Sequence, residues 1–163
     1  MVPSVTRVIG SLLPARPYHW LVVRVASLPG MPARRLRHSV VFRRPLRPGT
    51  EHYVLVPTEY SPSVLCLPAS TARRLQDDTR SWVAERGWSF VHIVVNFGAY
   101  QETPFLHVHL MPSETPPESG LTNPDWLTVE LEGDAGAIQS GRRVVRYDAA
   151  HDLAQVTTEV NRR

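Results

Sequence analysis

The residues best suited to chemistry are two histidines one residue apart, His107 and His109, within an apolar stretch at 105–111. If this stretch is a strand, side chains alternate between its two faces, so that Phe105, His107 and His109 share one face. The aliphatic residues between them then belong on the core, and the histidine face lines a cleft. A neutral imidazole near pH 7 is both a nucleophile and a proton carrier. The pair therefore points to nucleophilic or acid–base chemistry.

Several elements must position these histidines. The pattern of apolar and β-branched residues predicts strands at 20–25, 38–43, 52–56, 89–95, 105–111, 126–131 and 142–147. It predicts a main helix at 69–86, capped by Ser70 or Thr71 and stopped by Gly87, and a terminal helix at 149–160. Residues 112–124, with four prolines, are predicted to be a loop. Short hairpin-like connections favour an antiparallel α+β fold with one main helix and a C-terminal strand and helix extension.

The order of residues around the histidines carries a resemblance. A strand ends in Asn96-x-Gly, a short loop carries Gln101, and Phe-x-His-x-His follows at 105–109 with Pro112 close behind. Upstream, His52 precedes four apolar residues and Pro57. This arrangement resembles the histidine triad (HIT) superfamily over roughly residues 38–112. The resemblance implies a single HIT-like domain over 1–163, with 1–37 and 113–163 as elaborations, and a homodimer.

The resemblance also implies a mechanism. The middle histidine of the triad, which attacks the phosphorus of a nucleotide compound to form a nucleotidyl-histidine, falls on His107. The third histidine falls on His109, a donor to a phosphoryl oxygen or to the leaving group. His52 matches a histidine that approaches from the first hairpin, and Asn96 and Gln101 match positions that hold phosphoryl oxygens. This mechanism needs no metal and no cofactor.

Three positions depart from the family pattern, all at the ligand. Phe105 stands where the first triad histidine belongs, and a phenyl ring neither donates nor accepts that proton. Glu102 replaces a small hydroxyl residue, and it could serve as an acid or a base. Arg43 or Arg44 occupies a position that often carries an acid for ribose hydroxyls, and an arginine there suits an anionic substrate group.

We therefore expect a divergent hydrolase or transferase for a phosphoryl or nucleotidyl compound, repurposed for a non-nucleotide substrate in specialised biosynthetic metabolism. Two alternatives on the same scaffold stay open: an ordinary nucleotide-binding member with variant contacts, and a non-catalytic ligand-binding protein. A third comes from another class. His107, His109 and Glu114 echo the ligand pattern of cupins, and two histidines with a carboxylate suit Fe(II), Mn or Zn. Pro112 before Glu114, and the lack of a second ligand motif, count against it.

Composition narrows the setting. The chain of 163 residues, 42% hydrophobic and 20% charged, has globular values. No apolar run is long enough for a membrane span, and the lone Cys66 fits a reducing cytoplasm. Arginines gather between 34 and 47, but without the aromatic interleaving or zinc-finger spacing of a nucleic-acid reader. We expect a cytoplasmic protein whose partner is a small anionic molecule, with no nucleic acid and no membrane.

Overall fold

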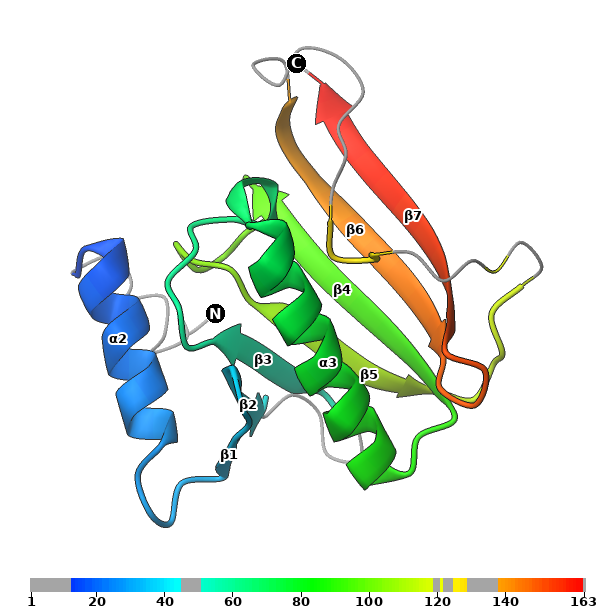
Figure 1. The fold of residues 1–163 in the computed structure, drawn as a ribbon. Coiled ribbons are helices and arrows are strands. Elements are labelled where there is room, and N and C mark those ends of the chain that lie inside the picture. The colour runs from blue at the N-terminus through cyan, green and yellow to red at the C-terminus, as the bar shows by residue number, and fades with distance from the viewer. Residues whose placement is uncertain (1–12, 45–50, 119–120, 122–124, 129–137, 163) are drawn as a thin grey trace, which may run out of the picture.

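Seven antiparallel strands form one open sheet in the order β1-β2-β3-β5-β4-β6-β7 (Figure 1). This computed structural model describes residues 13–44, 51–118, 121, 125–128 and 138–162. The mixed α+β class and the antiparallel pairing expected from the sequence are confirmed. The strands are β1 Ala33–Arg35, β2 Ser39–Arg43, β3 Tyr53–Pro57, β4 Phe90–Gly98, β5 Val108–Ser113, β6 Ile138–Asp148 and β7 Leu153–Arg162; the helices are α2 Ala15–Ala26 and α3 Ala69–Arg86, with a short 3-10 turn, η1 Val64–Cys66.

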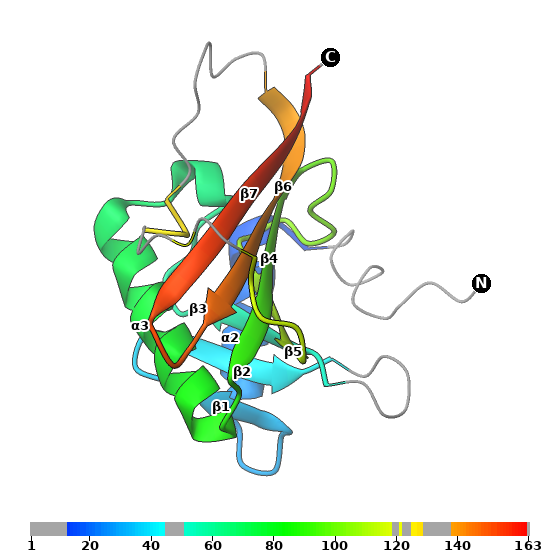
Figure 2. The ribbon, with the colours of Figure 1, turned by 90° about the vertical axis from the view of Figure 1, so that its right-hand side faces the viewer.

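The two helices cover different faces of the sheet. Helix α3 packs Leu75 and Val83 into the larger core, together with alternate residues of the strands such as Leu55. Helix α2 packs Tyr18 against the intervening residues, such as Val54, on the opposite face. Figure 2 views the sheet along its edge, with α3 on one side of it. The histidines lie on the α2 face, because they alternate with aliphatic residues that belong to the α3 core.

The central elements match their predictions closely. Helix α3 has the predicted bounds and ends at Gly87, whose φ of 66° is the left-handed conformation that glycine adopts at least cost. Its start differs from expectation, because Pro68 precedes the first turn and no side chain caps it. The predicted strands at 38–43, 52–56, 89–95 and 142–147 appear as β2, β3, β4 and part of β6.

The predicted strand at 20–25 is wrong, because this segment belongs to helix α2. The β-branched run of valines suggested a strand. Helical spacing instead brings Tyr18, Val22 and Ala26 onto one side, where they pack in the core cluster on the α2 face. Pro17 is compatible with a helix here because it lies in the first turn, where the backbone N–H has no intrahelical acceptor.

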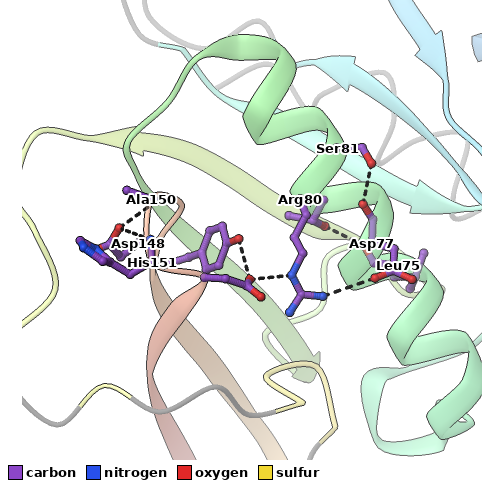
Figure 3. Close-up of polar contacts among 10 residues, drawn as sticks. Leu75, Asp77, Arg80, Ser81, Asp148, Ala150 and His151 are labelled. Atoms are coloured by element: carbon purple, nitrogen blue, oxygen red, sulfur yellow. Dashed lines mark hydrogen bonds and ion pairs between the residues drawn. The ribbon is translucent and has the colours of Figure 1, made fainter.

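The predicted helix at 149–160 is also wrong, because β7 occupies most of it and pairs with β6 from Leu153 onward. Ala154 and Val156 reach the core from β7, so burial follows a strand period. A turn joins the two strands, with Asp148 accepting from the backbone N–H groups of Ala150 and His151 (Figure 3). Helix α3 holds this turn in place, because Nε of Arg80 donates to Asp152 Oδ1 at 2.8 Å.

Two other predicted strands need correction. The stretch 105–111 enters the sheet only at Val108, and β5 continues through Pro112 to Ser113, residues predicted to be in a loop. Pro112 is tolerated because β3 pairs with β5 only as far as Leu110, which leaves no partner on that side for a proline without an N–H. In the predicted strand 126–131, residues 126–128 form a buried turn, and 129–131 lie outside the described residues.

Gly141 of β6 is placed where no side chain fits. A Cβ there would lie 2.4 Å from the carbonyl oxygen of Glu159 and 2.4 Å from Cζ of Phe97. Gly141→Ala is therefore expected to lower the free energy of unfolding by about 1–3 kcal/mol, the usual range for overpacking. Chemical denaturation measures this, with the exposed Thr157→Ala on β7 as the control. Equal stability of the two variants would contradict the close packing of Phe97 under β6.

Candidate functional site

Three buried histidines meet on the α2 face of the sheet. His52 directly precedes β3, and His109 lies in the neighbouring β5, opposite Val54. The Nε2 atom of His52 lies 2.9 Å from Nδ1 of His109. The rings of His107 and His109 meet edge to face with centroids 4.9 Å apart. The structure thus brings together the three residues expected to be catalytic.

The backbone fixes the protonation pattern of His107. Its Nδ1 lies 3.1 Å from the carbonyl oxygen of Phe105 and 2.7 Å from Oγ1 of Thr103. A carbonyl only accepts, so Nδ1 carries the proton and Nε2 of the neutral ring carries the lone pair. Nε2 has no partner among the described residues and is not one of the fully buried polar atoms. His107 therefore has the tautomer that a nucleophile needs.

All three histidines are held in the neutral state. Burial, followed by the nearby His107, His52, Arg44 and Arg142, lowers the pKa of His109 to about 3. Burial also lowers the pKa of His107, with the Phe105 carbonyl opposing and Arg44 assisting the change. Burial and Arg44 lower the pKa of His52. In the folded protein near pH 7 these rings are therefore uncharged, and each keeps a lone pair on one ring nitrogen.

A hollow of about 310 Å³ opens beside His52 and His109. His107 does not line it, and its ring lies against that of His109. Arg44 and Glu102 form an ion pair at its rim, at 3.4 Å. On the other side, Nε of Arg142 donates to Oδ1 of Asn96 at 3.1 Å. The hollow is lined by Arg44, His52, Val94, Asn96, Glu102, His109, Met111 and Arg142.

The remaining predicted substrate-binding residues lie elsewhere. Gln101 braces its own loop, with Nε2 donating to the carbonyl oxygens of Pro62 and Thr103 at 2.7 and 2.8 Å. Phe105 is 2% exposed and packs edge to face against Tyr18 of α2. Arg43 is exposed and pairs with Tyr53, a residue of the α3 face. The register therefore separates Arg43 from Arg44, and only Arg44 faces the hollow.

Two polar residues of the site were not anticipated from the sequence. Thr103 holds the nucleophile candidate through Nδ1 of His107. Arg142 reaches the hollow from β6, some 33 residues after His109, because β6 pairs with β4 and places Arg142 opposite Asn96. The strand at 142–147 was predicted, but its neighbour in the sheet was not. No local signal identifies such a long-range pairing.

Glu114 is not brought to the histidines. It follows β5 and borders a separate hollow with Trp88 and Phe90, at the end of the strand away from His107. Across the part of the chain that the structure describes, no group of three or more histidine, cysteine or acidic side chains converges as metal ligands would. The geometry therefore offers no support for a His107, His109 and Glu114 metal centre.

No protein-family model, no curated protein and no solved structure matches the chain. Within the described residues, no helix has the length and apolar character required to cross a membrane.

Proposed function

We propose that the chain is a divergent histidine triad-like enzyme, a hydrolase or transferase for a phosphoryl or nucleotidyl compound. The observation that carries the proposal is the state of His107, whose Nδ1 proton is held by the Phe105 carbonyl while Nε2 has no partner among the described residues. A neutral, oriented imidazole of this kind attacks phosphorus and leaves from it readily. The domain is proposed to be HIT-like and to act as a cytoplasmic homodimer without a metal or cofactor.

The proposed reaction has two steps. Nε2 of His107 attacks the phosphorus, a P–N bond forms, and the bond from phosphorus to the leaving group breaks. Water or another acceptor then attacks the same phosphorus, and the P–N bond breaks to return His107 to its neutral form. His109 supports both steps as a hydrogen-bond donor from Nε2, provided that His52 Nε2–H donates to His109 Nδ1 across their 2.9 Å contact.

The contacts of Phe105 support a divergent rather than an ordinary member. Its ring fills the core between α2 and the sheet, where a histidine would otherwise join the polar network. Thr103 supplies a polar contact to His107 instead, and Arg44 with Glu102 borders the hollow. We therefore propose a substrate other than an ordinary nucleotide, of the kind found in specialised biosynthetic metabolism.

Turnover of adenosine 5′-phosphoramidate tests how far the substrate has changed. Release of adenosine monophosphate at rates typical of enzymes would show that nucleotide chemistry is retained, and would contradict the changed substrate. No release is expected under the proposal. Elemental analysis of the purified protein is the companion measurement, because stoichiometric Fe, Mn or Zn would contradict a metal-free mechanism.

Thr103→Val tests the positioning of the nucleophile. Valine is nearly isosteric but lacks the hydroxyl within 2.7 Å of His107 Nδ1. We expect the rate of phosphorylation of His107 by a small phosphoryl donor to fall by about tenfold, the effect of roughly 1.4 kcal/mol. Thr103→Ser, which keeps the hydroxyl, should restore most of the rate. Equal rates for the valine and serine variants would contradict an orienting role for the hydroxyl.

A further inference from the structure

Two arginines lie on either side of the histidines along the sheet, Arg44 next to β2 and Arg142 on β6. Arg44 continues β2, with its backbone N–H donating to the carbonyl oxygen of His52 at 2.8 Å. Arg142 lies on β6, opposite Asn96. The sheet order β2-β3-β5-β4-β6 places four strand spacings between their backbones, roughly 19 Å at about 4.8 Å each. Both side chains nevertheless line the same hollow, with His109 on the central strand between them.

The two arginines lie at different places relative to the histidines, because Arg44 is bonded through its backbone to His52 whereas β4 separates Arg142 from the strand of His109. The positive charge of Arg44 influences the pKa of His107, His52 and His109 alike. The positive charge of Arg142 lowers the pKa of His109. Arg44 therefore lies on the His52 side of His109 and Arg142 on the opposite side, so that the two guanidinium groups can meet different parts of one bound molecule.

The charges that line the hollow are unbalanced. With the histidines neutral, its formal charges are the two arginines and Glu102. Glu102 pairs with Arg44 at 3.4 Å, while Arg142 has no carboxylate partner among the residues described. Arg142 uses Nε for Asn96, and its terminal nitrogens have no hydrogen-bond partner in the described chain. Such a planar fork suits two oxygens of a carboxylate or a phosphate.

The two other arginines of β6, Arg143 and Arg146, both have partners within the protein. Arg143, on the other face, is 9% exposed and donates to the carbonyl oxygen of Trp126 and to Thr158. Arg146, on the same face as Arg142, pairs with Glu118 at 3.7 Å. Arg142 differs from both, because its fork borders the hollow without an acidic or carbonyl partner among the described residues.

We propose that Arg44 and Arg142 bind two separate anionic groups of one substrate, on either side of His109. Arg44 meets the phosphoryl group under attack, and Arg142 binds a carboxylate or phosphate at the far end of the molecule. The substrate is thus an elongated compound with an anionic leaving-group end. The inference rests on the proposed function, since it takes this hollow to be the active site.

Binding of non-hydrolysable probes tests the second anion without any turnover. The probes are ω-phosphonocarboxylates, from 3-phosphonopropionate to 6-phosphonohexanoate, and the corresponding carboxamides, which lack the second charge. Isothermal titration calorimetry on the full chain gives Kd for each pair. At one or more chain lengths we expect the carboxylate to bind at least tenfold more tightly than its carboxamide.

Variants assign that preference to a residue. Arg142→Gln should abolish the carboxylate preference while changing Kd of the carboxamide by less than twofold, and Arg142→Lys should retain part of the preference. Arg44→Gln should weaken both probes. Arg146→Gln, on the same strand and face, is the matched control and should keep the full preference.

Two results would overturn the proposal: no carboxylate preference at any chain length, or a preference that survives in Arg142→Gln. Neither result bears on the proposed role of His107 as the nucleophile, because a phosphoryl adduct on His107 is measured separately. Conversely, an intact preference without any adduct on His107 would refute the proposed chemistry and keep the two-anion site.

Discussion

His107→Asn is expected to lower turnover of the native substrate by roughly 10⁴- to 10⁶-fold, as loss of a covalent nucleophile does in other enzymes. The asparagine amide can still donate to the Phe105 carbonyl, which His107 Nδ1 contacts at 3.1 Å. It lacks Nε2 with its lone pair, together with the outer part of the ring that packs against His109. Steady-state kinetics and denaturation curves on the same preparation measure the effect, and stability should change little.

His92→Asn is the matched control for this experiment. His92 lies on the same face of the sheet, opposite Met111 of β5, and does not line the hollow. Its replacement should leave turnover within about twofold of the unaltered protein. Retention of activity in His107→Asn would eliminate covalent catalysis by this residue, whatever the result for His92.

The unaltered protein is expected to lose stability steeply as pH falls from about 6.5 toward about 3, the pKa of His109. In this window the unfolded chain binds a proton on His109 and the folded chain does not. The unfolded state therefore binds more protons, and the free energy of unfolding falls as pH falls. The loss approaches about 1.4 kcal/mol per pH unit for this histidine alone. His52 and His107, whose pKa values are also lowered, add to it in the same direction.

His109→Asn isolates the contribution of His109. Asparagine does not titrate, and its side-chain oxygen can accept from His52 as Nδ1 of His109 does. Urea denaturation between pH 7 and pH 3 should show a shallower loss of stability in this variant, while His92→Asn keeps the steep loss. An unchanged slope in His109→Asn would show that the buried histidine does not control acid stability.

The local parts of the fold were predictable from the sequence. Helix α3 was found at its full length because its apolar period, Pro68 before it and Gly87 after it agree with one another. Segments 20–25 and 149–160 were misassigned because short apolar or β-branched runs satisfy both periods, and only packing decides between them. Tyr18 packs in the core on the α2 face as part of a helix that includes 20–25. Residues from Leu153 onward pair with β6, which makes that segment the strand β7.

The candidate site was predictable where its residues lie on adjacent strands whose alternation between the two faces can be read from the sequence. The spacing of His107 and His109 placed them on one face, and the first hairpin brought His52 to them. Arg43 and Arg44 could not be separated without the register, which sends them to opposite faces. Arg142 depends on the pairing of β6 with β4, a contact between segments far apart in the sequence.

The proposed mechanism requires a covalent adduct on His107, which can be detected directly. The protein is reacted briefly with small phosphoryl donors, inorganic phosphoramidate and acetyl phosphate, and the modified peptide is identified by mass spectrometry. We expect a phosphoryl group on His107 that is absent from His107→Asn. Absence of any adduct on His107, or equal modification of the exposed His151, would contradict a prepared nucleophile at this position.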